Sequence, residues 1–351
     1  MQIIRVRNVN DALMLGTQLL RDGGVWRESR AGRVIEYPEP VTTVYEKPYE
    51  RLLFSPARDA NPFFHFMEAL WMLDGRNDVK SISYYVKRME TFSDDGETLH
   101  GAYGYRWRNY FIQDQILNVI NRLKTSPEDR RVVLGMWDPA GDFYMGESDA
   151  RDVPCNTHIY FKIRDKNLHM TVCCRSNDMI WGAYGANAVH MSMLQEFIAY
   201  SVGVGIGRYT QISDSFHAYE DVYTKVEQEQ PDIDVFNSSS LILGGRYNTQ
   251  SVSSDGPGMI QEFTDHEQWL EILNGFLADA FIRNEEHKEE HYTADYDDPY
   301  FDLVAEPIAK AYWEHKNGHT RKAIETVSMC VASDWRVACT EWLERRLLSD
   351  N

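Results

Sequence analysis

The sequence predicts an α+β fold in which helices cover a mixed β-sheet and a helical extension follows at the C-terminus. Runs at Arg131 to Met136, Thr157 to Ile163 and Leu168 to Cys173 alternate or are apolar throughout, as strands do. Two largely apolar segments, Asn61 to Leu73 and Ala188 to Val202, have helical length and spacing. These strands and helices do not alternate regularly, which argues against a doubly wound fold.

Residues that start and stop helices mark the ends of these elements. Asn61 to Leu73 has a proline in its first turn and Gly75 just beyond its end, so we expect a buried helix there. The sequence RDKN joins the strands at 157–163 and 168–173 as a hairpin turn. The glycines of VGVGIG follow a helix and precede a strand at Arg208 to Ile212. A phosphate-binding glycine loop has the opposite order, so these glycines indicate a helix stop.

Length and composition are typical of a globular protein with a large core, with 351 residues of which 43% are hydrophobic. The N-terminus MQIIRVRN lacks the apolar run of a secretion signal, and no stretch approaches the roughly 18 apolar residues of a membrane span. We therefore expect a cytoplasmic protein without a membrane partner. The five cysteines form no CxxC pair, so neither a disulfide framework nor a structural metal site is expected.

The formal net charge of −18 argues against broad nucleic-acid binding, because a protein that follows a phosphate backbone needs a basic stripe. A mononucleotide is compatible with this charge. A few arginines can bind a single phosphate in an otherwise acidic protein, since the guanidinium offers a planar fork of donors.

Chemically capable residues gather around Cys155. This cysteine follows Pro154 at the start of a predicted strand, and the motifs CRSND and HAY lie downstream. A cysteine nucleophile reacts as a thiolate and needs a nearby cation, which Arg175 of CRSND could supply. A lone cysteine is more typical of an inert core residue, so the thiol alone leaves both interpretations open.

Residues 154 to 219 resemble the nucleotide-binding core of thymidylate synthases and of the phage-type deoxynucleotide hydroxymethylases. The motifs occur in the family's order: Pro-Cys, Arg-Ser-x-Asp in CRSND, a glycine-containing turn with an asparagine in GAYGAN, and His-x-Tyr in HAY. Upstream, SRAG is similar to the family's phosphate loop, EALW to its glutamate helix, YGYRWR to its Tyr-Gly-x-x-Trp-Arg element and DRRVVLGMWDP to its paired-arginine strand. The resemblance covers residues 25 to 225 or so.

The resemblance implies a thymidylate synthase-like catalytic domain at 1–297. From Asp298 onward, three segments have helical patterns with short polar breaks: EPIAKAYWEHKNG, HTRKAIETVSMCVAS and DWRVACTEWLERRLL. We expect residues 298–351 to form a helical C-terminal extension. If the chain is phage-encoded, as the resemblance suggests, the host cytoplasm is the expected location.

The resemblance also implies a set of catalytic residues. Cys155 would attack C6 of a pyrimidine nucleotide, so that C5 can accept the one-carbon unit of 5,10-methylenetetrahydrofolate. Glu68 would manage protons and water near C4 of the base, and a carboxylate in so apolar a helix suits that task. A glutamate that extends to the surface is the alternative. Tyr103 is the third catalytic position, and Asn187 would pair with the O4 and N3 edge of the pyrimidine.

Substrate binding would fall mainly to arginines. Arg30, Arg175 and Ser176 would bind the 5′-phosphate, with Arg130 and Arg131 supplied by the other subunit of a homodimer. Adjacent strand residues point to opposite faces, so one member of that arginine pair could be structural. Asp178 would hold the base region. His217 and Tyr219 would reach the ribose hydroxyl, because their spacing puts both on one face of a strand.

Several features depart from the family pattern. The histidine that usually follows the nucleophile is Asn156, and His158, expected on the same strand face, could compensate. GAYGAN carries one residue more than the usual turn. The segment Met89 to Gly96 lacks the tryptophans found near the transferred carbon in methylating members, and the last residues do not resemble their short apolar tail. A site open to water favours hydroxymethylation over reductive methylation.

The asparagine at 187 favours dUMP, since its amide matches uracil's O4 and N3–H, whereas dCMP remains possible. We therefore expect folate-dependent hydroxymethylation at C5 of a pyrimidine nucleotide. The first alternative is thymidylate synthase proper. The second is a non-catalytic nucleotide-binding protein, which would not need both Cys155 and Glu68. A zinc deaminase is excluded because its His-x-Glu and Pro-Cys-x-x-Cys signatures do not occur.

Overall fold

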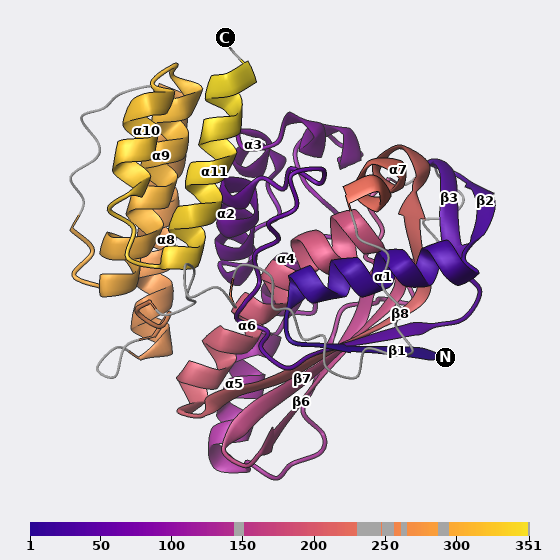
Figure 1. Ribbon diagram of the computed structural model, residues 1–351. Coiled ribbons are helices and arrows are strands. Elements are labelled where there is room, and N and C mark those ends of the chain that lie inside the picture. Colours follow the sequence, from indigo (N-terminus) through magenta and orange to yellow (C-terminus); the bar gives the residue numbers. More distant parts are fainter. Residues whose placement is uncertain (144–150, 230–246, 248–255, 261–264, 287–294, 350–351) are drawn as a thin grey trace. The chain divides into compact units, whose positions relative to one another are not determined.

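The computed structural model describes residues 1–143, 151–229, 247, 256–260, 265–286 and 295–349 (Figure 1). Their contacts divide the chain into two compact units. The first unit contains residues 1–60, 115–143, 154–229 and 247. The second contains 61–114, 151–153 and the described residues from 256 onward.

The first unit is built on a mixed eight-stranded β-sheet. Its strands lie in the order β1-β4-β8-β7-β6-β5, and β3 pairs with both β8 and β2. The strands are β1 (Gln2–Val6), β2 (Val25–Ser29), β3 (Gly32–Tyr37), β4 (Val41–Tyr45), β5 (Val133–Gly135), β6 (Asn156–Arg164), β7 (Asn167–Asp178) and β8 (Gly205–Tyr219).

Strand β8 is the centre of this sheet. On one side, β4 pairs with its middle, Tyr209–Ser213, and β3 with its last four residues, both antiparallel. On the other side, β7 runs parallel to it. A parallel pair needs a crossover, which the helical turn η4 (Met179–Ala186) and helix α6 (Asn187–Val202) provide. Gly203, at φ 82°, ends α6 in the left-handed conformation that a helix stop uses, as the glycine run predicted.

Helices cover one face of the sheet. Helix α1 (Val9–Gly23) contacts β1 and β3, α6 contacts β7 and β8, and α5 (Gln115–Thr125) contacts β5 and β6 (Figure 1). Strand β6 shows the resulting alternation, because Ile159, Phe161 and Ile163 are buried whereas Tyr160 and Lys162 are exposed. No described helix of this unit packs over the face that carries Tyr160 and Lys162.

A β-bulge near the start of β6 corrects one sequence-based expectation. Asn156 pairs with Cys174, but the register shifts before His158, which pairs with Cys173. Asn156 is fully buried beside Cys174, whereas His158 is half-buried on the other face. The extra residue reverses the alternation, so His158 does not lie on the same face as Asn156 and cannot stand in for it.

The second unit is helical. It contains α2 (Pro62–Leu73), α3 (Val79–Ser83), η1 (Lys87–Phe92), α4 (Tyr103–Tyr105), η2 (Arg106–Tyr110), α8 (His266–Glu286), η7 (Phe301–Ala305), α9 (Glu306–Lys316), α10 (Thr320–Val327) and α11 (Ser333–Ser349). Asn61 caps α2, as its side chain accepts the Phe64 N–H at 3.2 Å. Helices α8, α9 and α11 all contact α2 (Figure 1).

The three helices expected after Asp298 are present as α9, α10 and α11. They belong to the same compact unit as α2. The division into a catalytic domain of 1–297 and an extension of 298–351 stays a prediction about function, since the compact units are bounded elsewhere. The remaining helix of the first unit, α7 (Glu220–Glu229), follows β8 directly.

Gly104 allows α4 to approach the end of α2 at backbone distance. A Cβ at this position would lie 1.9 Å from the Met72 carbonyl oxygen. We expect Gly104→Ala to lower the free energy of unfolding by about 3 kcal/mol or to prevent folding, because neither backbone can give way. Gly275→Ala in α8 is the control, since no atom lies within 4 Å, and should gain roughly 0.5 to 1 kcal/mol. Chemical denaturation measures both, and equal stabilities would contradict the close approach.

Candidate active site

Cys155 lies immediately before β6 and is tied to β7 by Arg175. The main-chain N–H of Arg175 donates to the Cys155 carbonyl oxygen at 2.9 Å. The Arg175 side chain donates from Nε to the Pro154 carbonyl oxygen at 3.0 Å. Both bonds attach Arg175 to the main chain of the segment that carries the half-buried Cys155 thiol.

The cysteines that share this region differ in environment. Cys174 is buried and donates to Asn156 Oδ1 at 2.8 Å. Burial raises the pKa of the Cys174 thiol strongly, and the neighbouring Cys155 raises it further. Burial also raises the pKa of Cys173, on the opposite face of β7. Neither thiol has an environment that favours the thiolate.

The carboxyl ends of β7 and β8 bring two more predicted residues together. Asp178 lies opposite His217 in the parallel ladder between these strands. Asp178 Oδ1 accepts the N–H groups of Ile180 and Trp181, and Oδ2 accepts the Tyr219 N–H at 3.4 Å. Burial raises the pKa of Asp178, while these N–H groups and the neighbouring His217 oppose the rise.

Tyr219 links the end of β8 to the tip of the β2–β3 hairpin. Its ring packs at right angles against that of His217, with centroids 5.8 Å apart, so the two side chains share a face as predicted. Burial raises the pKa of Tyr219, as do the nearby Asp178 and Cys155, whereas Ser29 and Arg30 lower it. These interactions place the exposed Arg30 of the SRAG turn in the same neighbourhood as the Cys155 thiol.

Asn187 belongs to a chain of buried polar side chains. Its Nδ2 donates to Asn177 Oδ1 at 3.2 Å, and Asn177 Nδ2 donates to Ser213 Oγ at 3.0 Å. Most of GAYGAN lies in η4, a wide π-helical turn with a kink at Gly185. Gly182 leaves room for the hydrogen bond between Asn187 and Asn177, because a Cβ at position 182 would lie 2.7 Å from Asn177 Oδ1.

Arg130 and Arg131 precede β5 and are exposed. Strand β5 spans Val133–Gly135, so it is shorter than the strand predicted at Arg131 to Met136. Arg131 binds Asp129 through its main chain and both sides of its guanidinium, and holds the pKa of that carboxyl down at about 2. Arg130 makes no ion pair in the described part of the chain. The structure brings neither arginine to Arg175 within one chain.

The second unit carries the two remaining predicted catalytic residues. Every residue of α2 except Glu68 is buried, and one carboxylate oxygen of Glu68 is buried as well. Tyr103 begins α4, which contacts α2, and its ring lies 6.3 Å from that of Trp107. Ser176, in the first unit, is half-buried and pairs with Ser215 of β8.

Three residues beside this cluster were not singled out from the sequence: Glu36, Ser215 and Arg58. Trp181 was named, with Trp107, as an aromatic that could shield the transferred carbon and so favour methylation. Ser215 donates to Glu36 Oε1 at 2.5 Å and lies 3.2 Å from His217 Nδ1. The alternate spacing of Ser215, His217 and Tyr219 was the available signal for Ser215. Glu36 could not be found in this way, because its position depends on how β3 pairs with β8.

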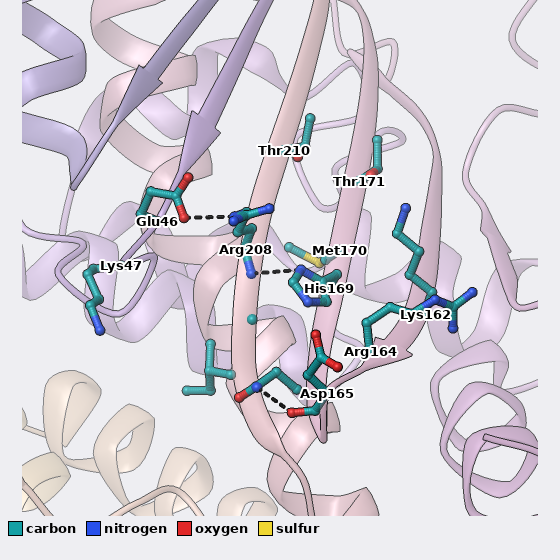
Figure 2. Close-up of a pocket in the computed structure, with 13 residues that line it drawn as sticks. Glu46, Lys47, Lys162, Arg164, Asp165, His169, Met170, Thr171, Arg208 and Thr210 are labelled. Atoms are coloured by element: carbon teal, nitrogen blue, oxygen red, sulfur yellow. Dashed lines mark hydrogen bonds and ion pairs between the residues drawn. The ribbon is translucent and has the colours of Figure 1, made fainter. Parts of the chain in front are cut away.

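A separate cavity of about 560 Å³ lies over β6, β7 and the start of β8, on the face that no described helix covers. Figure 2 shows Arg208 between Glu46, whose carboxylate it pairs with at 2.7 Å, and His169, which accepts the Arg208 N–H at 3.1 Å. Lys162 and Arg164 also line it. None of the predicted site residues does, so this cavity is not the site around Cys155.

Two features of the described residues bear on other functions. These residues contain no group of three or more His, Cys, Asp or Glu side chains placed to bind a metal ion. None of the described helices is both long and apolar enough to cross a membrane.

The fold and the cluster define an α+β protein in which an arginine is hydrogen-bonded to the segment that carries a cysteine, with polar side chains at two adjacent strand ends. A family model described as thymidylate synthase matches residues 58–253. The chain is 44% identical to the deoxyuridylate hydroxymethyltransferase of Pseudomonas phage M6, over 99% of this chain and 95% of that protein. It is 33% identical to the enzyme of the same name from Bacillus phage SP01, over 73% and 69%.

A solved structure supports the fold assignment. The crystal structure of thymidylate synthase from T4 phage superposes with a TM-score of 0.51 and 22% identity, covering 62% of this chain and 80% of that one. The chain therefore belongs to the thymidylate synthase family and is an enzyme of that type. Members of the family bind a nucleotide and use methylenetetrahydrofolate.

Proposed function

We propose that this protein transfers a one-carbon unit from 5,10-methylenetetrahydrofolate to C5 of dUMP and releases 5-hydroxymethyl-dUMP. The observation that carries the proposal is the double attachment of Arg175 to the Pro154–Cys155 segment, through its main-chain N–H and through its side chain. A cation held to that segment supports Cys155 as the nucleophile. The name of the phage relatives, deoxyuridylate hydroxymethyltransferase, supports the same substrate and product.

In this proposal the Cys155 thiolate adds to C6 of the uracil ring. The C5–C6 double bond then becomes a nucleophilic enolate carbon at C5. Methylenetetrahydrofolate, when bound, supplies the one-carbon unit that C5 receives. Loss of the C5 proton and departure of the thiolate restore the aromatic ring once the new group is in place. Glu68 and Tyr103 are proposed to manage these protons and the water near the base.

The nucleotide is proposed to lie along the ends of β7 and β8. Arg30, Arg175 and Ser176 would bind its 5′-phosphate, because a guanidinium fork suits a phosphate and Arg30 lies on the same side of the site as Tyr219. His217 and Tyr219 would bind the sugar. Asp178 would support the base region through the backbone N–H groups that it orders.

The side chain of Asn187 favours uracil over cytosine as the base of the substrate. Its Nδ2 already donates to Asn177, and its Oδ1 accepts no hydrogen bond in the described part of the chain. An acceptor at this position complements the N3–H of uracil. Cytosine presents a lone pair at N3 instead, so two acceptors would face each other.

A folate has a suitable surface in the first unit. Trp181 is 43% exposed, which is unusual for so large an apolar side chain, and the buried Arg58 guanidinium stacks on its ring at 4.0 Å. Asp178 fixes the start of this turn by accepting the Trp181 N–H. An indole supported on one side by a cation fits a planar heterocycle, so we propose Trp181 as a folate contact.

Water rather than hydride is proposed to complete the reaction. Hydride transfer would give dTMP and dihydrofolate, whereas hydration gives the hydroxymethyl product and tetrahydrofolate. The segment Lys87–Phe92 offers a charged Arg88 and a 38% exposed Phe92, and no tryptophan that could exclude water. Water exclusion is what suppresses the competing hydration.

The product and the folate test this proposal together. With dUMP and methylenetetrahydrofolate, mass spectrometry should find a nucleotide heavier by one CH2O unit, and the folate should remain tetrahydrofolate. A difference of about 1.4 kcal/mol between the two barriers sets a tenfold product ratio, so one outcome should dominate. Parallel reactions with dCMP and CMP control for base and sugar. Methylated nucleotide with dihydrofolate would instead make the protein a thymidylate synthase in the strict sense.

We also propose a symmetric homodimer in which Arg130 and Arg131 complete the partner's phosphate site. The face of the sheet that no described helix covers carries Tyr160, at 44% exposed, and Val133, at 46%. Such apolar exposure on a flat sheet suits an isologous contact. Arg130 is the better donor of the two, because Asp129 already binds Arg131.

Mixing two inactive variants tests whether the site is shared. Cys155→Ser lacks the nucleophile but keeps Arg130. Arg130→Ala lacks that arginine but keeps the nucleophile. After subunit exchange, each heterodimer should hold one complete site, so activity should recover to about one quarter of wild type. Mixing Arg130→Ala with a Cys155→Ser/Arg130→Ala double variant is the control and should not recover. Activity equal to the mean of the separate variants would remove Arg130 from the shared site.

A further inference from the structure

His217 lies between two carboxylates that come from different strands. In the antiparallel β3–β8 ladder, Glu36 is opposite His217. In the parallel β7–β8 ladder, Asp178 is opposite the same histidine. Ser215, two residues earlier on β8, lies on the Glu36 side and within hydrogen-bonding distance of both Glu36 and the imidazole.

The direction of these hydrogen bonds is fixed by Glu36. Arg27 Nε lies 3.1 Å from Glu36 Oε2, and a carboxylate in an ion pair can only accept hydrogen bonds. The Ser215 hydroxyl therefore donates its one proton to Glu36 Oε1, at 2.5 Å. Ser215 Oγ is left with lone pairs only. At the 3.2 Å contact with His217, the imidazole Nδ1 must be the donor.

Within the described residues, Asp178 makes no hydrogen bond to the imidazole. Its Oδ1 accepts the N–H groups of Ile180 and Trp181, and its Oδ2 accepts that of Tyr219. The other imidazole nitrogen, His217 Nε2, makes no hydrogen bond in the part of the chain that the structure describes. Its lone pair is available to a ligand.

We infer that Glu36, acting through Ser215, is a positioning residue that keeps the His217 proton on Nδ1, so that Nε2 accepts a hydrogen bond from the nucleotide's 3′-hydroxyl. This inference rests on the proposed function, since dUMP has one free sugar hydroxyl, at C3′. The hydroxyl donates to Nε2, Nδ1 donates to Ser215, and Ser215 donates to Glu36. The three hydrogen bonds run in one direction, from the sugar hydroxyl to the Glu36 carboxylate. A chain of this kind that ends on a charged acceptor strengthens each of its bonds.

This arrangement makes the site selective for a donor at C3′. A 3′-hydroxyl can donate to Nε2 and can also accept from the neighbouring Tyr219 phenol. A 3′-fluoro substituent can only accept, and it would face the Nε2 lone pair. Glu36 would thus contribute to sugar recognition without touching the sugar.

Glu36→Gln reverses the direction of these hydrogen bonds with little change in the shape of the side chain. The amide can donate to Ser215, which then donates to Nδ1 and moves the ring proton to Nε2. The ¹⁵N shifts and ¹H–¹⁵N couplings of neutral, labelled histidine distinguish the two forms, and a His217→Gln spectrum assigns the signal. We expect the Nδ1–H form in wild type, the Nε2–H form in Glu36→Gln and a mixture in Ser215→Ala. Glu28→Gln, an exposed carboxylate on β2, is the matched control and should resemble wild type.

Binding provides the second readout, with dUMP and 3′-fluoro-2′,3′-dideoxyuridine 5′-monophosphate as probes. Wild type should prefer dUMP by roughly tenfold, the cost of one unmade hydrogen bond, and Glu36→Gln should bring that ratio close to one. An Nε2–H form in wild type, or an unchanged tautomer in folded Glu36→Gln and Ser215→Ala, would overturn the inference. If the tautomers shift as expected but wild type binds neither nucleotide, the polarity set by Glu36 stands and the proposed nucleotide site fails.

Discussion

The site depends on the pairing of β7 with both of its neighbours. On one side, the Arg175 N–H donates to the Cys155 carbonyl oxygen at 2.9 Å, which ties the cysteine's segment to β7. On the other side, the parallel ladder with β8 sets Asp178 opposite His217. A slip of one residue in either ladder would turn alternate side chains to the wrong face, so strand register determines which groups can meet.

Most of the fold and the motif-bearing side chains could be predicted from the sequence. The helix at 61–73 is signalled by apolar spacing, a first-turn proline and Gly75, and the structure has α2 at Pro62–Leu73. His217 and Tyr219 share a face because strand residues two apart do so whatever the strand pairs with. Both features depend only on local geometry, which short sequence patterns can predict.

Features that depend on long-range pairing could not be predicted. The bulge that separates Asn156 from His158 is a property of the β6–β7 ladder, and single-strand alternation gave the wrong face. Asp129 binds Arg131 through a local turn, which a paired-arginine motif does not reveal. Glu36 carries no motif at all. It reaches His217 only because β3 pairs with the last residues of β8.

Hydrogen exchange at C5 tests most directly whether Cys155 adds to C6 of the uracil ring. Reversible addition makes C5 a carbanion-like centre, which takes up a solvent proton before the thiolate leaves. In deuterated water, without folate, wild type should therefore convert dUMP to its C5-deuterated form, as mass spectrometry would detect. Cys155→Ser should not, although it should still bind dUMP. Exchange at the wild-type rate in Cys155→Ser would contradict the covalent mechanism.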